Sequence, residues 1–191
     1  NTNGEVADER TSFQPRSPYA VGKAAAFWGL ANYREAYGLF ACSGILFNHE
    51  SPLRPERFVS QKIVAAACRI ASGSKEKLIL GNIDIHRDWG WAPEYVQAMW
   101  LMLQQDKSDD YVIATGETNS LKDFVCAVFS KLGMNWYDHV ECNSALLRPT
   151  DILISRANPA KARKKICWEA QYKMSDVARM MVDAQLQLME K

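Results

Sequence analysis

The chain enters its first helix through the stretch Pro15-Arg16-Ser17-Pro18-Tyr19-Ala20-Val21-Gly22-Lys23. Ser17 is a favourable N-cap, and Pro18 suits the first helical position, where its missing N–H costs nothing. The residues that follow predict a helix that continues to about Tyr37, with Gly38 as the residue that ends it.

Tyr19 and Lys23 are four residues apart on this predicted helix, so both side chains leave the same face. A nearby ammonium group favours the phenolate form of a tyrosine, which suits the phenol to proton transfer. Taken alone, Y-x-x-x-K is a short pattern that more often forms an ordinary pair on a helix surface. The surrounding sequence has to decide between these two interpretations.

Downstream of this helix, short apolar runs alternate with amphipathic stretches. The pattern predicts buried strands over 39–47, 77–80 and 111–115, and helices over 58–72, 92–105, 120–132, 159–165 and 175–189. The polar residues Asn48-His49-Glu50 follow the first of these strands, so we expect its carboxyl end to deliver side chains to a site. Strands that alternate with helices predict an α/β fold with a parallel sheet.

A glycine-rich phosphate-binding turn normally follows the first strand of a parallel nucleotide-binding sheet. The sequence contains neither G-x-G-x-x-G nor G-x-x-x-x-G-K. We therefore expect the chain to supply the second half of such a sheet.

The composition excludes several classes of protein. The chain has 191 residues, of which 48% are hydrophobic and 24% charged, so it is neither disordered nor collagen-like. Its 23 Lys and Arg balance 22 Asp and Glu, which gives no electrostatic signal for nucleic acid or an anionic membrane. No apolar run approaches the roughly 18 residues of a membrane span, and we expect no signal peptide in the polar segment 1–14.

The five cysteines are an odd set without a C-x-x-C pair. This pattern argues against a disulfide framework and against a zinc site, and we expect no bound metal. The default expectation is a protein of the reducing cytoplasm.

The context of Tyr19 and Lys23 resembles a known superfamily. Residues 15–23, followed by Asn32-Tyr33-Arg34-Glu35-Ala36-Tyr37-Gly38, resemble extended short-chain dehydrogenases/reductases. The stretch Gly44-Ile45-Leu46-Phe47-Asn48-His49-Glu50-Ser51-Pro52-Leu53-Arg54 is similar to the GDP-mannose 4,6-dehydratase family. Four further segments show the same similarity: Leu80-Gly81-Asn82, Arg87-Asp88-Trp89-Gly90, Trp100-Leu101-Met102-Leu103-Gln104-Gln105 and Ile113-Ala114-Thr115-Gly116.

The resemblance implies a redox-neutral conversion of GDP-mannose to GDP-4-keto-6-deoxymannose on tightly held NADP. Tyr19 then corresponds to the acid/base that takes the proton of the C4 hydroxyl. Lys23 corresponds to the residue that holds the nicotinamide ribose and favours the phenolate. His49 and Arg54 match contacts to NADP, and an arginine suits a phosphate as a bidentate donor.

The resemblance also implies a set of substrate contacts. Lys62, Arg87 and Arg148 match positions that meet the GDP diphosphate or its nucleoside. Asn48 matches a polar contact near the sugar and diphosphate. Asp151 stands where the family usually has Glu, and the resemblance implies that it accepts hydrogen bonds from ribose hydroxyls. Each of these residues, taken singly, is more often a surface charge or a capping residue.

The implied architecture is the C-terminal half of a Rossmann-like parallel sheet, interleaved with a small α/β domain that binds the nucleotide sugar. Residues 1–51 and 92–133 are assigned to the NADP-binding domain, and residues 52–91 and 134–191 to the substrate domain. The resemblance further implies a homo-oligomer, either a dimer or a tetramer. The isolated chain is expected to be poorly soluble or oligomeric, because half a sheet leaves apolar surface uncovered.

The sequence departs from the family in ways that leave alternatives open. The family's Ser/Thr-x-Glu-x-Phe-Gly motif, whose Glu removes the C5 proton, is absent, and we expect it to lie upstream of residue 1. Cys167 replaces a usual Gly, and Gln61 replaces an Arg. The alternatives are a catalytically incomplete fragment that binds a GDP-sugar, and a related nucleotide-sugar epimerase or reductase.

Overall fold

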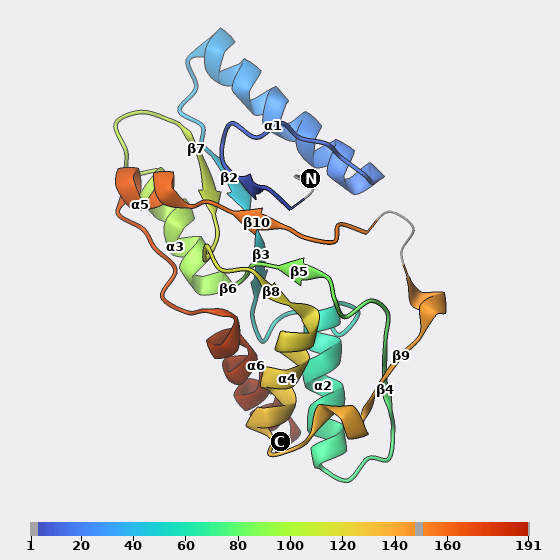
Figure 1. The fold of residues 1–191 in the computed structure, drawn as a ribbon. Coiled ribbons are helices and arrows are strands. Elements are labelled where there is room, and N and C mark those ends of the chain that lie inside the picture. Colours follow the sequence, from blue (N-terminus) through green and yellow to red (C-terminus); the bar gives the residue numbers. More distant parts are fainter. Residues whose placement is uncertain (1–3, 148–150, 191) are drawn as a thin grey trace.

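The structure, a computed structural model, describes residues 4–147 and 151–190. Figure 1 shows a long helix at one end of the molecule, a bundle of helices at the other and short strands between them. The long helix is α1 (Pro18–Tyr37), and the bundle consists of α2 (Val59–Ala71), α4 (Leu121–Lys131) and α6 (Met174–Met189). Two shorter helices, α3 (Ala92–Met102) and α5 (Ala160–Ile166), lie beside the strands.

Parallel pairing predominates among the strands of the described residues, as the sequence predicted. The parallel pairs are β1 (Val6–Ala7) with β10 (Arg156–Ala157), β2 (Ser43–Leu46) with β7 (Asp110–Ile113), β3 (Asn48–Glu50) with β6 (Trp89–Trp91), and β4 (Leu78–Leu80) with β9 (Val140–Cys142). One pair is antiparallel and joins β5 (His86–Arg87) to β8 (Asn119–Ser120). Two short 3-10 turns cover Trp136–Asp138 and Ser144–Leu146.

Two boundaries and one pair of unpredicted strands differ most from the sequence prediction. The strand expected over 39–47 begins only at Ser43, because residues 39–42 connect α1 to the sheet and Ala41 O accepts a hydrogen bond from Arg34 Nε. The helix expected over 92–105 ends at Met102. The sequence predicts no strand over 87–90, but this stretch contributes to β5 and β6.

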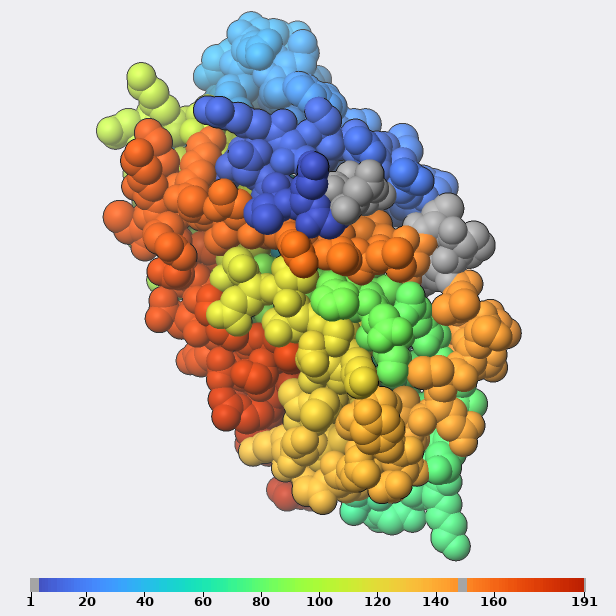
Figure 2. Space-filling view, viewed as in Figure 1, coloured from blue at the N-terminus to red at the C-terminus, as the bar shows by residue number. Residues whose placement is uncertain are grey.

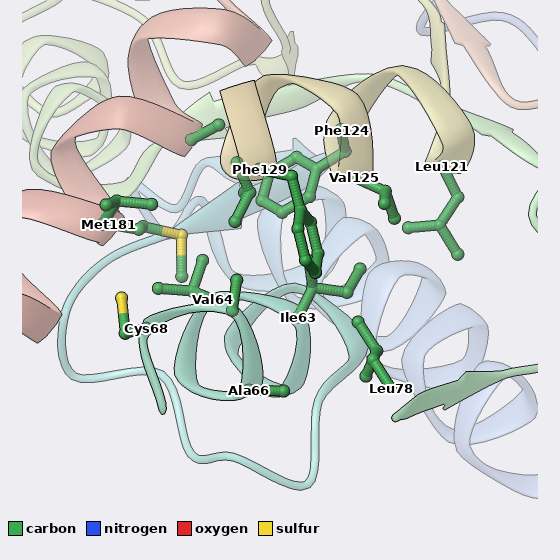
Figure 3. Close-up of a cluster of buried hydrophobic side chains, with 14 of the residues drawn as sticks. Ile63, Val64, Ala66, Cys68, Leu78, Leu121, Phe124, Val125, Phe129 and Met181 are labelled. Carbon is green, nitrogen blue, oxygen red and sulfur yellow. The ribbon is translucent and has the colours of Figure 1, made fainter. Parts of the chain in front are cut away.

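The main core fills the space between α2, α4 and α6. Ile63 and Val64 of α2 and Phe124 and Phe129 of α4 are fully buried there, and Met181 of α6 closes the cluster (Figure 3). Burying each such side chain contributes about 1.5–3 kcal/mol to the free energy of unfolding, so this bundle contributes strongly to the stability of the fold. The domain division stays a prediction, and α4, which it assigns to the first domain, shares its core with α2 and α6.

Helix α1 has the predicted ends but little packing. The Ser17 hydroxyl accepts a hydrogen bond from the Ala20 N–H, and Gly38 has φ +63°, a conformation that glycine adopts without strain. None of its 20 residues is buried, and in the space-filling view the helix forms one end of the molecule (Figure 2). It is attached through Arg34, whose guanidinium donates two hydrogen bonds to the Asp110 carboxylate at 2.7 and 3.2 Å.

No helix within residues 4–147 and 151–190 is long and apolar enough to cross a membrane.

Candidate functional site

A cavity of 920 Å³ opens between the amino-terminal end of α1, the carboxyl end of β3 and the loop before α2. This volume lies in the range of small-molecule and cofactor sites. Six of the nine site residues predicted from the sequence line it: Tyr19, Asn48, His49, Arg54, Arg87 and Asp151.

Strand β3 supplies three consecutive residues of the cavity wall, Asn48, His49 and Glu50. β3 runs parallel to β6, with His49 opposite Gly90, so the carboxyl ends of the two strands meet at one edge. The polar residues that follow the apolar run thus reach the site from a sheet edge, where parallel folds place their ligands.

Backbone and aromatic contacts fix the orientation of His49. Its Nδ1 lies 2.9 Å from Phe47 O, and because a carbonyl can only accept, Nδ1 carries a proton and donates. The imidazole ring lies beside the Tyr95 ring, with centroids 4.9 Å apart. Nε2 is therefore the ring nitrogen available to a ligand.

Gly90 makes room for Tyr95. A Cβ at position 90 would lie 2.4–2.8 Å from three atoms of the Tyr95 side chain, which no real packing tolerates. The buried Tyr95 hydroxyl lies 3.5 Å from Asn48 O, and burial raises the pKa of this phenol well above its ordinary value. Tyr95 therefore stays protonated and acts as a fixed support for the β3 backbone and the His49 ring.

Tyr19 reaches the cavity from the first turn of α1. Its side chain is 75% exposed, and the Lys23 Nζ lies 5.9 Å from the centre of its ring. Tyr19 lines the cavity, whereas Lys23 stands one helical turn behind it and outside the wall. The geometry thus places the ammonium over the Tyr19 ring and the Tyr19 side chain at the cavity.

Arg87 and Asp151 form an ion pair in the cavity wall, with 3.1 Å between Nη2 and Oδ1. Both side chains are largely buried, at 15% and 24% exposed. The sequence predicted one as a cation for the diphosphate and the other as an acceptor for ribose hydroxyls. The structure brings them together at one side of the cavity.

Besides Lys23, two predicted residues are not seen in the wall. Lys62 donates from Nζ to Ile79 O at 2.7 Å and does not line the cavity. Arg148 lies outside the described residues. The proposed roles of both residues stay predictions.

Glu50, Arg57, Phe58 and Trp89 line the cavity as well, and sequence reasoning did not select them. Glu50 is 2% exposed, and its Oε2 lies 3.1 Å from Arg54 Nε. Burial raises the pKa of the Glu50 carboxyl, while the Arg54 guanidinium and the Ser60 hydroxyl oppose that rise. The available signal was a charged residue directly after an apolar strand, a position where burial demands a partner.

Asp88 connects the cavity wall to the end of β7. Its fully buried carboxylate accepts hydrogen bonds from the N–H groups of Thr115 and Gly116 at 3.0 and 2.8 Å. Burial raises the pKa of Asp88, and these two donors with nearby Lys173 oppose the rise. Arg87 and Trp89, which flank Asp88 in the sequence, line the cavity. The two hydrogen bonds of Asp88 therefore hold this part of the cavity wall against the segment that follows β7.

The charges of the cavity favour an anionic ligand. Arg54, Arg57 and Arg87 contribute three positive charges, against the two carboxylates of Glu50 and Asp151. Arginine is the side chain best suited to phosphate, because its planar fork presents paired donors. The described residues contain no group of three or more His, Cys, Asp or Glu side chains able to hold a metal ion.

Residues 2–181 match the family model described as GDP-mannose 4,6 dehydratase. The chain is 51% identical over 183 residues to GDP-mannose 4,6 dehydratase 1 of Arabidopsis thaliana, which covers 96% of the chain and 51% of that protein. It is 42% identical over 198 residues to the human GDP-mannose 4,6 dehydratase, covering 95% of the chain and 53% of that protein. The chain thus spans about half the length of the curated relatives it matches.

Solved structures share the fold. A structure of RMD from Pseudomonas aeruginosa complexed with NADPH superposes with a TM-score of 0.87 at 19% identity, over 98% of this chain and 64% of that one. UDP-glucose 4-epimerase of Thermus thermophilus, in complex with NAD, gives a TM-score of 0.80 at 26% identity, over 96% of this chain and 58% of that one. The predicted α/β fold of extended short-chain dehydrogenases/reductases is confirmed by these superpositions.

Proposed function

The chain belongs to the GDP-mannose 4,6-dehydratase family, and we propose from this that it is the C-terminal half of an enzyme that converts GDP-mannose to GDP-4-keto-6-deoxymannose with bound NADP. The observation that supports this most strongly is the placement of Tyr19, His49 and Arg54 around one cavity whose arginines outnumber its carboxylates.

The residues of the chain divide the proposed work between them. Tyr19, as the phenolate, takes the proton of the substrate's C4 hydroxyl and becomes a neutral phenol. Lys23 stabilises the phenolate before that step and holds the nicotinamide ribose. His49 and Arg54 hold the cofactor. NADP, when bound, supplies the acceptor and donor of a hydride, which none of the amino-acid side chains can do.

The substrate side of the cavity has its own set of contacts. Arg87, with Lys62 and Arg148 as further cations, is proposed to neutralise the GDP diphosphate. Asn48 contacts the region between the sugar and the diphosphate, and Asp151 accepts from ribose hydroxyls. The Arg87–Asp151 ion pair supports this division, because it holds the cation and the acceptor 3.1 Å apart at one side of the cavity.

The elimination of water needs a base at C5 that we expect to come from the amino-terminal half of the enzyme. The acidic residues Glu5, Asp8 and Glu9 precede α1, and Glu9 already accepts a hydrogen bond from the Val112 N–H at 2.8 Å. Because the Glu9 carboxylate accepts this backbone hydrogen bond, it is not held in the geometry that abstraction of the C5 proton demands.

The family membership also supports the proposal that the enzyme is a cytoplasmic homo-oligomer, a dimer or a tetramer. The uncovered α1, in which no residue is buried, provides surface for packing against further protein.

The full-length protein tests the proposed activity. Incubated with GDP-mannose and NADP, it is expected to yield a nucleotide sugar that has lost one water and gained a carbonyl, detected by mass spectrometry. A product of unchanged mass but altered stereochemistry would instead establish an epimerase. Binding of both ligands without any product would establish a GDP-sugar-binding protein, and calorimetry of residues 1–191 with GDP-mannose measures how much of that binding this chain supplies.

A further inference from the structure

A buried carboxylate lies in a cavity wall that otherwise favours anions. Glu50 is 2% exposed and ends β3, where it pairs in register with Trp91 of β6. Burying a carboxylate is costly, and placing one beside a phosphate site adds repulsion. The position therefore calls for a reason beyond packing.

Arg54 supplies that reason, because Glu50 and Phe58 together hold its guanidinium on two sides. Oε2 of Glu50 lies 3.1 Å from Nε, an ion pair at one edge of the planar group that lacks the alignment of a hydrogen bond. The Phe58 ring lies against one face, with 3.9 Å between Cζ and the ring centre. The two terminal amino groups are the part of the guanidinium that these contacts leave for a ligand.

Arg57, the next arginine on the loop, lacks an ion pair of this kind among the described residues and serves as a comparison for Arg54. Arg57 also lines the cavity and lies near the same ring, with its Cζ 5.0 Å from the ring centre. Arg57 is exposed and makes no ion pair within the described part of the chain. Both arginines sit on the loop between β3 and α2, so the difference between them is the strand-borne carboxylate.

We propose that Glu50 is a positioning residue for the phosphate-binding arginine of the cofactor site: it fixes Arg54 through Nε so that the terminal amino groups face a phosphate of the dinucleotide. This inference rests on the proposed function, which assigns Arg54 to NADP. Prior fixation lowers the ordering cost of binding, since a long arginine side chain on a loop otherwise samples many rotamers.

Affinity for NADPH, measured on the full-length protein by the change in nicotinamide fluorescence, tests the proposal without any turnover. Glu50→Gln keeps the shape and removes the charge, and it is expected to raise the dissociation constant about tenfold. Glu50→Asp is expected to recover part of the loss. Glu56→Gln is the matched control, because Glu56 lies on the same loop but pairs with Arg69, and it should leave the affinity unchanged.

A double-mutant cycle separates positioning from general damage to the fold. Arg54→Ala is expected to weaken NADPH binding, and Glu50→Gln added to it should cause no further loss, since its effect passes through the guanidinium. An additive loss, or an unchanged affinity in the single Glu50→Gln variant, would overturn the proposal. If the unaltered protein binds no NADPH, the proposed function itself fails, which is a different and distinguishable result.

Discussion

Among the proposed chemical roles, that of Tyr19 follows most directly from the position of a side chain at the cavity. Its phenol reaches the cavity while Lys23 stands behind its ring. Tyr19→Phe removes only the hydroxyl, so kcat for GDP-mannose is expected to fall by about 10²–10⁴ while substrate affinity stays the same. Steady-state kinetics and calorimetry on the full-length protein measure the two quantities separately.

Tyr33→Phe is the matched control for this substitution. Tyr33 lies on the same helix, is 56% exposed and does not line the cavity. The Tyr33→Phe substitution should therefore leave kcat for GDP-mannose unchanged. An equal loss in both variants would mean that the helix, and not the Tyr19 hydroxyl, limits the reaction.

Cys167 illustrates a residue that the local backbone disfavours. It follows α5 with φ 52°, which is the left-handed region, and it stands where the family usually has Gly. A side chain in this conformation costs about 1–2 kcal/mol, partly offset by the extra freedom that glycine gives the unfolded chain. Cys167→Gly is therefore expected to raise the free energy of unfolding by about 0.5–1 kcal/mol in urea titrations.

The same substitution in a helix should have the opposite sign. Cys126 is exposed in the middle of α4, so Cys126→Gly is expected to lower stability by about 0.5–1 kcal/mol. Two changes of the same sign would show that loss of the thiol matters more than the backbone conformation.

At the scale of elements, the Arg34–Asp110 ion pair joins α1 to the sheet. Burial alone would raise the pKa of Asp110, but hydrogen bonds from Arg34 and Ser43 outweigh it and lower the pKa. A carboxyl whose pKa is lowered by folding contributes stability that is complete above its ordinary pKa of about 3.9 and is lost as the pH falls through the folded value. The Arg34–Asp110 contact should therefore weaken in acid.

Asp110→Asn is expected to lower the free energy of unfolding at pH 7 by about 1–2 kcal/mol and to speed hydrogen exchange along α1. The stability gap to the unaltered chain should narrow below about pH 4, because the native carboxyl then becomes neutral as well. Asp106→Asn is the control: Asp106 lies four residues earlier in the chain, is exposed and makes no ion pair among the described residues, so this variant should change neither quantity. A gap that stays constant down to pH 2 would contradict this account.

The helices could be predicted from the sequence more closely than the strands. Ser17, Pro18 and Gly38 determine both ends of α1 locally, and apolar spacing placed α2, α4 and α6 within about two residues. The strands β5, β8 and β10 have two residues each, too few for any periodicity to show. Their existence depends on which backbone lies alongside, and that is a property of the tertiary fold.

The candidate site shows a similar division. The residues that line the cavity and that the sequence identified, among them Tyr19, His49 and Arg54, belong to stretches recognisable as family motifs. Glu50 was missed although it lies inside one of those stretches, because its significance comes from its burial and its 3.1 Å contact with Arg54. Contacts of this kind arise from loop geometry that no local pattern specifies.

For the whole molecule, the two ends differ in how completely they are packed. The bundle of α2, α4 and α6 encloses a fully buried core, whereas α1 contributes no buried residue. Three of its aromatic side chains are mostly in solvent: Trp28 at 64%, Tyr33 at 56% and Tyr37 at 70% exposed. Tyr33 and Tyr37 lie one helical turn apart, with ring centroids 5.4 Å apart, whereas Trp28 lies on another face of the helix. Large aromatic side chains left in solvent are a liability, and in the full-length protein we expect further protein to cover them.

The isolated chain of 191 residues is therefore expected to self-associate. Light scattering over a range of concentrations should give a mass that rises above that of the monomer, because association is the way left to bury α1. Trp28→Lys combined with Tyr33→Lys should shift the chain towards monomer, since charge on the helix opposes its burial. Leu188→Lys, at an equally exposed site on α6, should have no such effect, and a monodisperse monomer of the unaltered chain at high concentration would show that α1 tolerates water without a partner.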